Sequence, residues 1–497
     1  MKKLLLLLVL ISFRATALVY NVPAQYATIQ AALTACTAND TVLVQPGTYT
    51  ENISWPNVAG IKLLSAGDST NTIINGNAAG RVISITVSSA DTNTLIQGFT
   101  ITNGFLNATW CYGSGVYINN AGAKIDHCHI TANGMTTGTW GYGIGLYCYN
   151  STVGIYNSTI SNNTANSSGY AHGTVYISNN SSATLENVTV RDNVLTATNY
   201  AFGGGIYCGT TSHLILTQSS VINNTVSSGG YDYGAGLNID DSQATLTNVL
   251  VAGNIIAGTP NFFYGGGIYA NNSTVDLNQV TVAENHRDNG STINGSGLYA
   301  RMASIVTAQN CIFWNVNSGA DVSNNASTVT INYSDVRGGF AGSGNINSLP
   351  LFVSASDFHL TATSPCINTG TLAGAPPMDI ENNPRPLPVG TNPDMGAYEF
   401  DQLSTGGINY SFNTISPAMT AFYIPAENVL LINTPRATDA DISVFDAAGK
   451  EIFQSGNKKL FAGSNSFSVM PSNPAAGIYY AAITSGAEMV RVKFYIP

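Results

Sequence analysis

An asparagine recurs every 30 or 31 residues through most of this 497-residue chain, and that period limits what the chain can fold into. Before each asparagine runs a short segment in which apolar residues alternate with others, as in 185–190 (LENVTV). Such alternation is typical of a half-buried strand. A second, glycine-rich strand follows later in each repeat, as in 205–207 (GIY). The recurring asparagines are Asn103, Asn133, Asn163, Asn193, Asn224, Asn254, Asn285 and Asn315.

A repeat of two or three short strands cannot bury its own apolar face, so neighbouring repeats must stack and share one core. The sequence therefore predicts an all-β fold, a parallel β-helix with about 30 residues per rung. Strands of successive rungs would lie roughly 4.8 Å apart, which aligns equivalent residues in columns. Asparagine suits a corner column because it tolerates left-handed backbone and its amide both donates and accepts hydrogen bonds.

Charge limits the partners. Only 9% of the residues are charged, the formal net charge is −10, and the isoelectric point is near 4.9. Nucleic acid and anionic membrane both require concentrated Lys and Arg, which the repeats lack. We therefore expect neither as a partner.

The N-terminus predicts export. Lys2 and Lys3 precede an apolar run from Leu4 to Ile11, and the small residues 15–17 (ATA) supply a cleavage site, so residues 1–17 read as a signal peptide. The run is too short for a membrane span, and no later segment reaches the ~20 apolar residues that a span needs. We expect no membrane span in the mature chain.

The seven cysteines show no metal-binding spacing. Cys148 and Cys208 each follow the tyrosine of the glycine-rich strand, so alternation points them into the core. They lie two rungs apart, roughly 10 Å by rung spacing, which is too far for a disulfide. We expect buried thiols and no bound metal.

The segment 28–33 (TIQAAL) predicts a short helix that caps the first rung, and residues 40–53 (DTVLVQPGTYTENI) predict two strands around a Pro-Gly turn. Together they resemble the start of secreted right-handed parallel β-helix proteins, the group that includes pectate lyases and pectin methylesterases. The resemblance implies a right-handed β-helix with its cap over residues 18–348. Residues 349–400 resemble the segment that closes bacterial β-helices. Its Asp, His and Glu residues suggest either a site or the polar groups that a cap needs.

After a polar linker at 401–420, short alternating strands predict a small β-sandwich at 421–497. Its segments 425–430 (PAENVL), 442–450 (ISVFDAAGK) and 477–480 (GIYY) resemble the C-terminal sorting domain of type IX secretion in Bacteroidota. The resemblance implies that the type IX secretion machinery is a partner and that the protein is secreted or attached to the outer-membrane surface. An ordinary β-sandwich binding module is the alternative.

Three aromatic columns follow the period. Alternation points the tyrosines of the glycine-rich strand outward, and Asn238 interrupts them: Tyr117, Tyr147, Tyr176, Tyr207, Tyr269 and Tyr299. A column about seven residues earlier holds Trp110, Trp140, Tyr170, Tyr200, Tyr231 and Phe262. A column five residues earlier holds Tyr112, Tyr142, Phe202, Tyr233 and Tyr264.

An exposed aromatic strip beside hydroxyls and amides suits sugars, whose C–H faces pack on aromatic planes. The earlier two columns therefore predict binding of a polysaccharide or surface glycan, or a role in adhesion. The competing interpretation is that the rings only stabilise the stacked rungs, in which case the rod is a spacer.

Catalysis is the alternative function. Asp240, Asn271 and Arg301 should occupy successive rungs on the outward face, near Asp241 and Tyr269. Such a group could orient an acidic sugar in a divergent polysaccharide lyase or glycoside hydrolase. Lyases of the resembled family hold Ca²⁺ with clustered carboxylates, whereas the carboxylates here are scattered, so no cofactor is expected and Ca²⁺ enters only under the lyase alternative. Asp232 and the segment 284–288 are further candidates.

Overall fold

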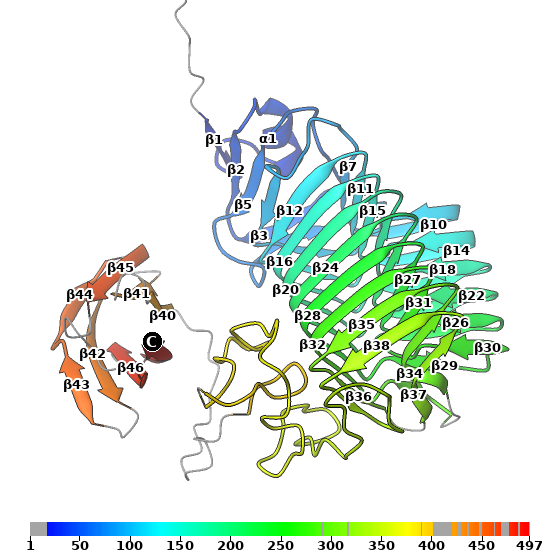
Figure 1. Cartoon of the computed structure of the whole chain (residues 1–497). Coiled ribbons are helices and arrows are strands. Elements are labelled where there is room, and N and C mark those ends of the chain that lie inside the picture. Colours follow the sequence, from blue (N-terminus) through cyan, green and yellow to red (C-terminus); the bar gives the residue numbers. More distant parts are fainter. Residues whose placement is uncertain are drawn as a thin grey trace, which may run out of the picture. The chain divides into compact units, whose positions relative to one another are not determined.

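The computed structural model forms two compact units, residues 1–403 and 404–497 (Figure 1). The predicted signal peptide lies outside the described residues except for Ala17, and the predicted linker lies outside them except for Thr420. The structure describes residues 17–289, 293–315, 318–388, 390–400, 420–424, 429–434, 437–446, 450–461, 463–468, 477–485 and 488–496.

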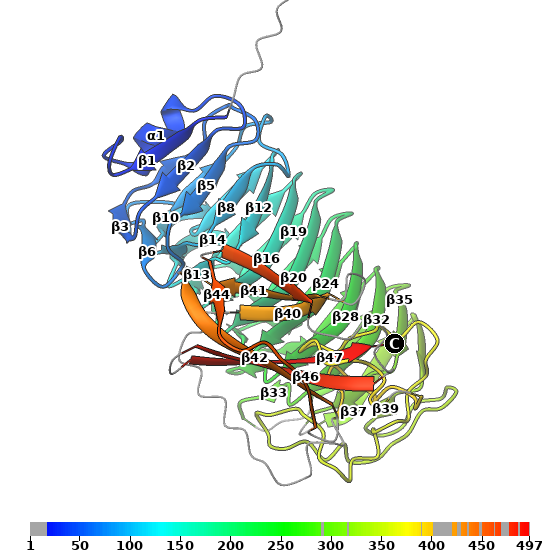
Figure 2. The same ribbon diagram turned by 90° about the vertical axis from the view of Figure 1, so that its left-hand side faces the viewer.

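The first unit is a rod of stacked rungs whose strands pair in parallel with those of the next rung, in two large sheets (Figures 1 and 2). This confirms the predicted parallel β-helix. The first sheet contains β1 (Val19–Val22), β2 (Thr41–Val44), β3 (Gly47–Thr50), β5 (Lys62–Ser65), β6 (Thr72–Asn75), β8 (Leu95–Gln97), β9 (Thr100–Thr102), β12 (Gly122–Asp126), β13 (His129–Thr131), β16 (Thr152–Ser161), β20 (Ser182–Arg191), β24 (His213–Ile222), β28 (Gln243–Ala252), β32 (Thr274–Ala283), β35 (Ile305–Gln309), β36 (Ile312–Trp314), β38 (Thr328–Asn332) and β39 (Asp335–Val336).

The second sheet has two parts. The glycine-rich strands and their continuations at both ends of the rod are β4 (Ile53–Ser54), β7 (Ile83–Ile85), β11 (Val116–Asn119), β15 (Leu146–Tyr149), β19 (Val175–Ser178), β23 (Ile206–Gly209), β27 (Leu237–Asp240), β31 (Ile268–Asn271), β34 (Ile293–Arg301) and β37 (Ser318–Asn325). The remaining strands project from the rod and are β10 (Phe105–Tyr112), β14 (Gly134–Tyr142), β17 (Thr164–Ser167), β18 (Tyr170–His172), β21 (Val194–Ala197), β22 (Tyr200–Phe202), β25 (Thr225–Ser228), β26 (Tyr231–Tyr233), β29 (Ile255–Ala257), β30 (Phe262–Tyr264) and β33 (His286–Arg287).

Helix α1 (Ile29–Ala35) lies at the N-terminal end of the rod, as the sequence predicts (Figure 1). The Thr28 side chain accepts a hydrogen bond from the Ala31 N–H at 3.1 Å and so caps the helix. The Glu51 carboxylate accepts the N–H groups of Ile29 and Gln30, each at 2.8 Å. These bonds satisfy helix N–H groups that have no partner within the helix.

The main core lies between the sheets and consists of inward-facing Ile, Val and Leu in columns. Cys148 and Cys208 belong to it, are fully buried and form no disulfide, which confirms the prediction for these two residues. Burial raises the pKa of both thiols to about 12. They therefore act as small apolar core residues.

The asparagine column forms a buried hydrogen-bonded ladder from Asn133 to Asn315. Each amide Nδ2 donates to Oδ1 of the next rung at 2.8–3.0 Å, and Oδ1 also accepts the backbone N–H from the rung before. At the last rung the N–H and the amide of Asn315 donate to the Asp321 carboxylate.

Two details of the predicted asparagine column were wrong. Phe105 pairs with Gly134, so Gly104 occupies the first ladder position and Asn103 stands one residue too early. A side chain at Gly104 would meet the Ser114 carbonyl oxygen at 2.1 Å, which explains the glycine. The left-handed backbone belongs to the residue before every ladder asparagine except Asn315, as at Asn162 (φ 56°) and Asn223 (φ 56°). The ladder asparagines therefore serve hydrogen bonding, and the preceding residue makes the turn.

A stack of β-arches projects from one side of the rod, and we call it the fin (Figure 1). It comprises residues 105–112, 134–142, 164–172, 194–202, 225–233 and 255–264. Each arch doubles back on itself around a small separate core that includes Leu195, Ala201 and Val226. The two arms of one arch are in direct contact, because a methyl group added at Gly141 on the returning arm would lie 2.9 Å from the sulfur of Met135 on the outgoing arm.

Residues 349–400, the closing segment, pack along the outer flank of the last rungs (Figure 1). Phe358 packs with Leu250, Ala252 and Ala283, and the Ala397 N–H donates to Thr281 Oγ1 at 2.9 Å. The covered residues come from β28 and β32. The segment therefore covers a side of the rod as well as following its last rung.

The second unit is antiparallel. Leu430 of one sheet and Ile442 and Val444 of the other share an apolar core, as a small sandwich requires. Among the described residues, no helix is both long and apolar enough to span a membrane. The strands are β40 (Thr420–Ile424), β41 (Val429–Thr434), β42 (Thr438–Asp446), β43 (Glu451–Gln454), β44 (Lys458–Leu460), β45 (Gly463–Ser468), β46 (Gly477–Ser485) and β47 (Glu488–Ile496).

Candidate functional site

The tyrosines of the glycine-rich strands point away from the main core, as predicted, but most of them are buried. Tyr207 is 8% exposed and Tyr269 is 4% exposed. The reason is the returning arm of each arch, which ends in a glycine with left-handed backbone, such as Gly203 (φ 62°), and lies against the tyrosine that follows. We call these residues the covered column; they are Tyr117, Tyr147, Tyr176, Tyr207, Tyr269 and Tyr299.

The rings that cover this column come from the predicted third column, which we call the inner fin column. Tyr142 lies 5.0 Å from Tyr176, and Tyr233 lies 4.6 Å from Tyr269, between ring centroids. His172 fills the position that the sequence reading left vacant. The repeat is one residue shorter there, yet the spacing from Tyr170 to His172 matches the spacing from Trp140 to Tyr142. The full column is Tyr112, Tyr142, His172, Phe202, Tyr233 and Tyr264.

His172 is a neutral member of this stack. Burial lowers its pKa to about 3, and neither ring nitrogen has a hydrogen-bond partner among the described residues. Its ring centroid lies 4.8 Å from that of Phe202. It therefore acts as an aromatic spacer between rungs.

The second predicted column lies on the solvent-facing side of the returning arms, and we call it the outer fin column. It runs Trp110, Trp140, Tyr170, Tyr200, Tyr231 and Phe262 through six paired rungs. Neighbouring ring centroids are 6.0, 3.9, 4.8, 4.7 and 4.8 Å apart. The two end rings are the most open, with Trp110 52% exposed and Phe262 46% exposed. The inner members are partly exposed.

Ring orientation decides what this column can bind. Trp140 and Tyr170 are stacked with an interplanar angle of 8°, so each covers a face of the other. Tyr200 is tilted by 59° against Tyr170 and by 71° against Tyr231, so the middle of the column combines a stacked pair with tilted rings. Trp110 and Phe262 each have a ring neighbour from the column on one side only and are its most exposed rings.

Asp240, Asn271 and Arg301 occupy successive rungs, as the sequence predicts. The Asp240 carboxylate accepts hydrogen bonds from Asn271 Nδ2 at 2.6 Å and from the Tyr207 hydroxyl at 3.1 Å. Arg301 Nη1 donates to the Tyr269 hydroxyl at 3.3 Å. Burial raises the pKa of Asp240, although both hydrogen bonds oppose the shift. The group therefore joins an acid, an amide and a guanidinium at the edge of the covered column.

A gap in the covered column lies beside this group. Asn238 stands where the other rungs have tyrosine and is 2% exposed. Its Oδ1 and the Arg301 Nε are buried without a hydrogen-bond partner among the described residues. The sequence shows the interruption at Asn238, but its burial depends on the fin, which alternation within the strand does not reveal.

The other candidates lie elsewhere. Asp241 is a corner residue (φ 49°) that accepts a hydrogen bond from Asn272 at 2.6 Å. Asp232 is buried inside the fin, and desolvation raises its pKa to about 6. Glu284 is a corner residue (φ 56°), and Arg287 is buried over the Phe263 ring.

The acidic and histidine residues of the closing segment hold that segment together. His359 lies between Asp357 at 2.6 Å and Glu381 at 3.1 Å, so both ring nitrogens are engaged. The buried Glu399 forms an ion pair with Arg385 at 3.0 Å. No group of three or more His, Cys, Asp or Glu that could hold a metal ion occurs within the described part of the chain.

Comparison with known families identifies both units. Residues 52–254 match the family described as right handed beta helix region, and residues 421–497 match the secretion system C-terminal sorting domain. This chain is a secreted right-handed β-helix protein. Its sorting domain directs it through type IX secretion to the cell surface or the extracellular space. No curated protein matches the sequence.

Two solved structures match this chain at low identity. One is the tailspike protein gp49 from Acinetobacter baumannii bacteriophage Fri1, a capsular polysaccharide depolymerase, with 9% identity, 97% of this chain and 78% of that chain covered, and a TM-score of 0.21. The other is the catalytic unit of the thermostable GH87 alpha-1,3-glucanase from Streptomyces thermodiastaticus strain HF3-3, with 13% identity, 64% of this chain and 65% of that chain covered, and a TM-score of 0.23.

Proposed function

We propose that this β-helix protein binds polysaccharide outside the cell through the outer fin column, either free polysaccharide or the glycans of a surface to which the cell adheres. The observation that supports the proposal is an uninterrupted file of six partly exposed aromatic rings on the solvent side of the fin. Exposed apolar files of this kind are uncommon on soluble proteins unless they meet a partner.

The dimensions favour a chain over a single sugar. The six rungs have five spacings of roughly 4.8 Å between them, which give a file about 24 Å long. Trp110 and Phe262 present ring faces on which pyranose rings can pack, and the hydroxyls of Tyr170, Tyr200 and Tyr231 can exchange hydrogen bonds with sugar hydroxyls between them. The low charge of the file suits a ligand recognised by shape and hydrogen bonding.

A second candidate function, cleavage of an acidic glycan, has its support in the Asp240 group. Arg301 can bind a uronate carboxylate, and a buried carboxyl group with a raised pKa can transfer a proton. Asp240 is the single carboxylate among the three predicted residues, so they make a poor Ca²⁺ site. Positioning of an acidic sugar is therefore better supported than metal-assisted elimination.

One experiment separates the two candidates. The full-length chain is incubated with neutral and acidic polysaccharides, with and without Ca²⁺, and bound polymer, unsaturated products and new reducing ends are measured in the same samples. We expect binding without product, reduced in the Trp110→Ala/Trp140→Ala variant and retained in Asp240→Asn. Product formation that disappears in Asp240→Asn would establish the enzyme instead. Neither binding nor product would leave the rod a spacer.

A further inference from the structure

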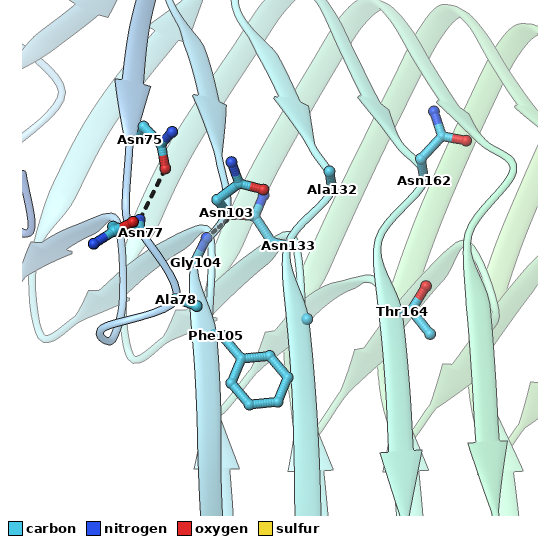
Figure 3. Close-up of a pocket in the computed structure, with 11 residues that line it drawn as sticks. Asn75, Asn77, Ala78, Asn103, Gly104, Phe105, Ala132, Asn133, Asn162 and Thr164 are labelled. Atoms are coloured by element: carbon cyan, nitrogen blue, oxygen red, sulfur yellow. Dashed lines mark hydrogen bonds between the residues drawn. The ribbon is translucent and has the colours of Figure 1, made fainter. Parts of the chain in front are cut away.

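A hollow lies on the face of the fin opposite the outer fin column. It has a volume of about 520 Å³ and opens to solvent (Figure 3). Its walls come from four successive turns of the rod: Asn75, Asn77, Ala78, Asn103, Gly104, Phe105, Ala132, Asn133, Gly134, Asn162 and Thr164.

The position of Phe105 separates this hollow from the aromatic file. Leu106 and Cys111, on the two arms of the first arch, both pack in the small core of the fin. Phe105 alternates with Leu106, and Trp110 alternates with Cys111, so Phe105 and Trp110 face outward on opposite sides of the arch. A ligand in the hollow therefore cannot touch the outer fin column.

Small residues create the hollow at this height of the rod. In the next rung, Ala132 and Gly134 occupy the columns of Asn103 and Phe105. These two residues are small and leave the space open. Two rungs beyond Gly134, the larger Val194 occupies the same column. The Phe105 ring lies over Gly134, since a methyl there would sit 3.1 Å from ring atom Cδ2.

The Phe105 ring differs from the rings of the fin columns. It is 37% exposed, and no other aromatic ring within the described chain packs against it. The Cδ2–Cε2 side of the ring lies against Gly134, and the rest of the ring borders the hollow. A solitary open ring face is the platform on which the C–H face of a pyranose packs.

Three of the polar side chains around the hollow are amides whose hydrogen bonds are incomplete. Asn75 Oδ1 accepts the Asn77 N–H at 2.8 Å, which fixes the loop. In the described part of the chain, Asn75 Nδ2 and the amides of Asn77 and Asn103 make no hydrogen bond to protein. The Ala78 N–H donates to the Asn103 carbonyl at 2.8 Å, so backbone bonds hold the two rungs together while the amides stay available. Figure 3 shows the three amides on neighbouring turns beside the hollow.

We infer that this hollow binds a neutral pyranose, a hexose or an N-acetylhexosamine, at a site separate from the outer fin column. Its volume is within the range of small-ligand sites. Amide donors and acceptors match sugar hydroxyls, the Phe105 face matches the sugar C–H face, and no lining residue carries a charge that would favour a uronate. The site stands independently of whether the aromatic file binds polysaccharide.

The test uses the full-length chain and saturation-transfer NMR. The probes are the methyl glycosides of glucose, galactose and mannose, N-acetylglucosamine, and glucuronic acid as the charged comparison. We expect a neutral sugar to bind, and Phe105→Ala or Asn103→Ala to weaken its binding about tenfold or more. Gly134→Ala, which leaves all amides in place, should weaken binding by displacing the ring.

Ile305→Ala is the matched control, because it removes an exposed apolar side chain from β35, outside both the hollow and the fin. Its neutral-sugar affinity should equal that of the natural chain. If Trp110→Ala loses the sugar and Phe105→Ala keeps it, the hollow is not the site although the outer fin column binds glycan. Binding of glucuronic acid alone, or of none of these sugars, also overturns the inference.

Discussion

Two surfaces of the rod carry columns of outward-facing apolar side chains, and they differ in what lies over them. On the flank of β28 and β32, Leu250, Ala252 and Ala283 are buried under Phe358 of the closing segment. On the fin, Trp110 and Phe262 remain about half exposed. The flank shows that this chain covers an apolar column when the column serves its own stability. The uncovered file on the fin is therefore better explained by a partner from outside the chain.

The largest effect is expected where the closing segment is held by a buried charge pair. Arg385 and Glu399 have no exposed side-chain surface and lie 3.0 Å apart. Arg385→Met leaves the Glu399 carboxylate buried without its cation, which should destabilise the first unit by about 3–5 kcal/mol. Denaturant unfolding measures the loss, and hydrogen exchange at the Ala397 N–H reports release of the segment.

The exposed pair Arg191–Asp192, at 2.6 Å, supplies the control. Arg191→Met should change stability by less than about 0.5 kcal/mol, because a solvated ion pair contributes little. Equal losses in the two arginine variants would contradict the view that the segment is clamped from within.

Phe358→Ala tests the apolar part of the same contact. Phe358 is 7% exposed and packs on three side chains of the flank, so its removal should cost about 3 kcal/mol. Trp110→Ala, in contrast, should cost less than about 1 kcal/mol, because half of that side chain is already in water. Denaturant unfolding of both variants gives the comparison directly. A Trp110 loss as large as the Phe358 loss would mean that the fin rings are structural.

Binding sharpens the comparison on the fin. Trp110→Ala/Trp140→Ala removes one end of the file, including the ring with the most open face, and should weaken polysaccharide binding about tenfold or more. Tyr207→Phe is the matched control, because it changes a covered ring and loses only the hydroxyl bonded to Asp240. Affinity electrophoresis against the best polymer of the screen measures both. Similar affinities for the two variants would place the ligand elsewhere on the rod.

The stacking of this fold follows from the sequence because a column needs only a constant period. Exposure does not follow from the sequence, because alternation fixes which way Tyr207 points but does not show that His172 and its neighbours fold back over it. Asn103 was wrongly assigned to the asparagine ladder because the paired positions of its rung and the next, such as Phe105 and Gly134, are 29 residues apart and not 30. His172 was missed because its rung is one residue shorter than its neighbours.

One signal of the covered flank is nevertheless present in the sequence. Outward positions of the central rungs hold Thr189 and Arg191, whereas the equivalent positions two rungs later hold Leu250 and Ala252. A change from polar to apolar at fixed outward positions marks a surface that another segment covers. The outer fin column is aromatic in all six rungs and shows no such change. Its sequence pattern alone therefore does not distinguish a cover supplied by this chain from an external partner.

The smallest expected effect is a pH dependence confined to the closing segment. The hydrogen bond to Glu381 raises the pKa of His359 to about 9, and Asp357 adds to the shift against partial burial. Because the folded pKa lies above the ordinary value of about 6.5, the stabilisation is complete below pH 6.5 and is lost as the pH rises through 9. His359 is partly exposed, so solvent screening limits the effect to about 1 kcal/mol or less.

His359→Gln isolates this contribution. The stability difference between the natural chain and the variant, measured by denaturant unfolding at pH 6 and at pH 9.5, should shrink towards zero at the higher pH, since other titrating groups contribute equally to both proteins. The protection factor of the Ala397 N–H, which is the exchange rate corrected for its intrinsic pH dependence, should fall over the same range in the natural chain only. Sugar binding on the fin should not follow this titration. A parallel loss of binding would show that the closing segment and the fin are coupled, and that the covered and uncovered surfaces are not independent.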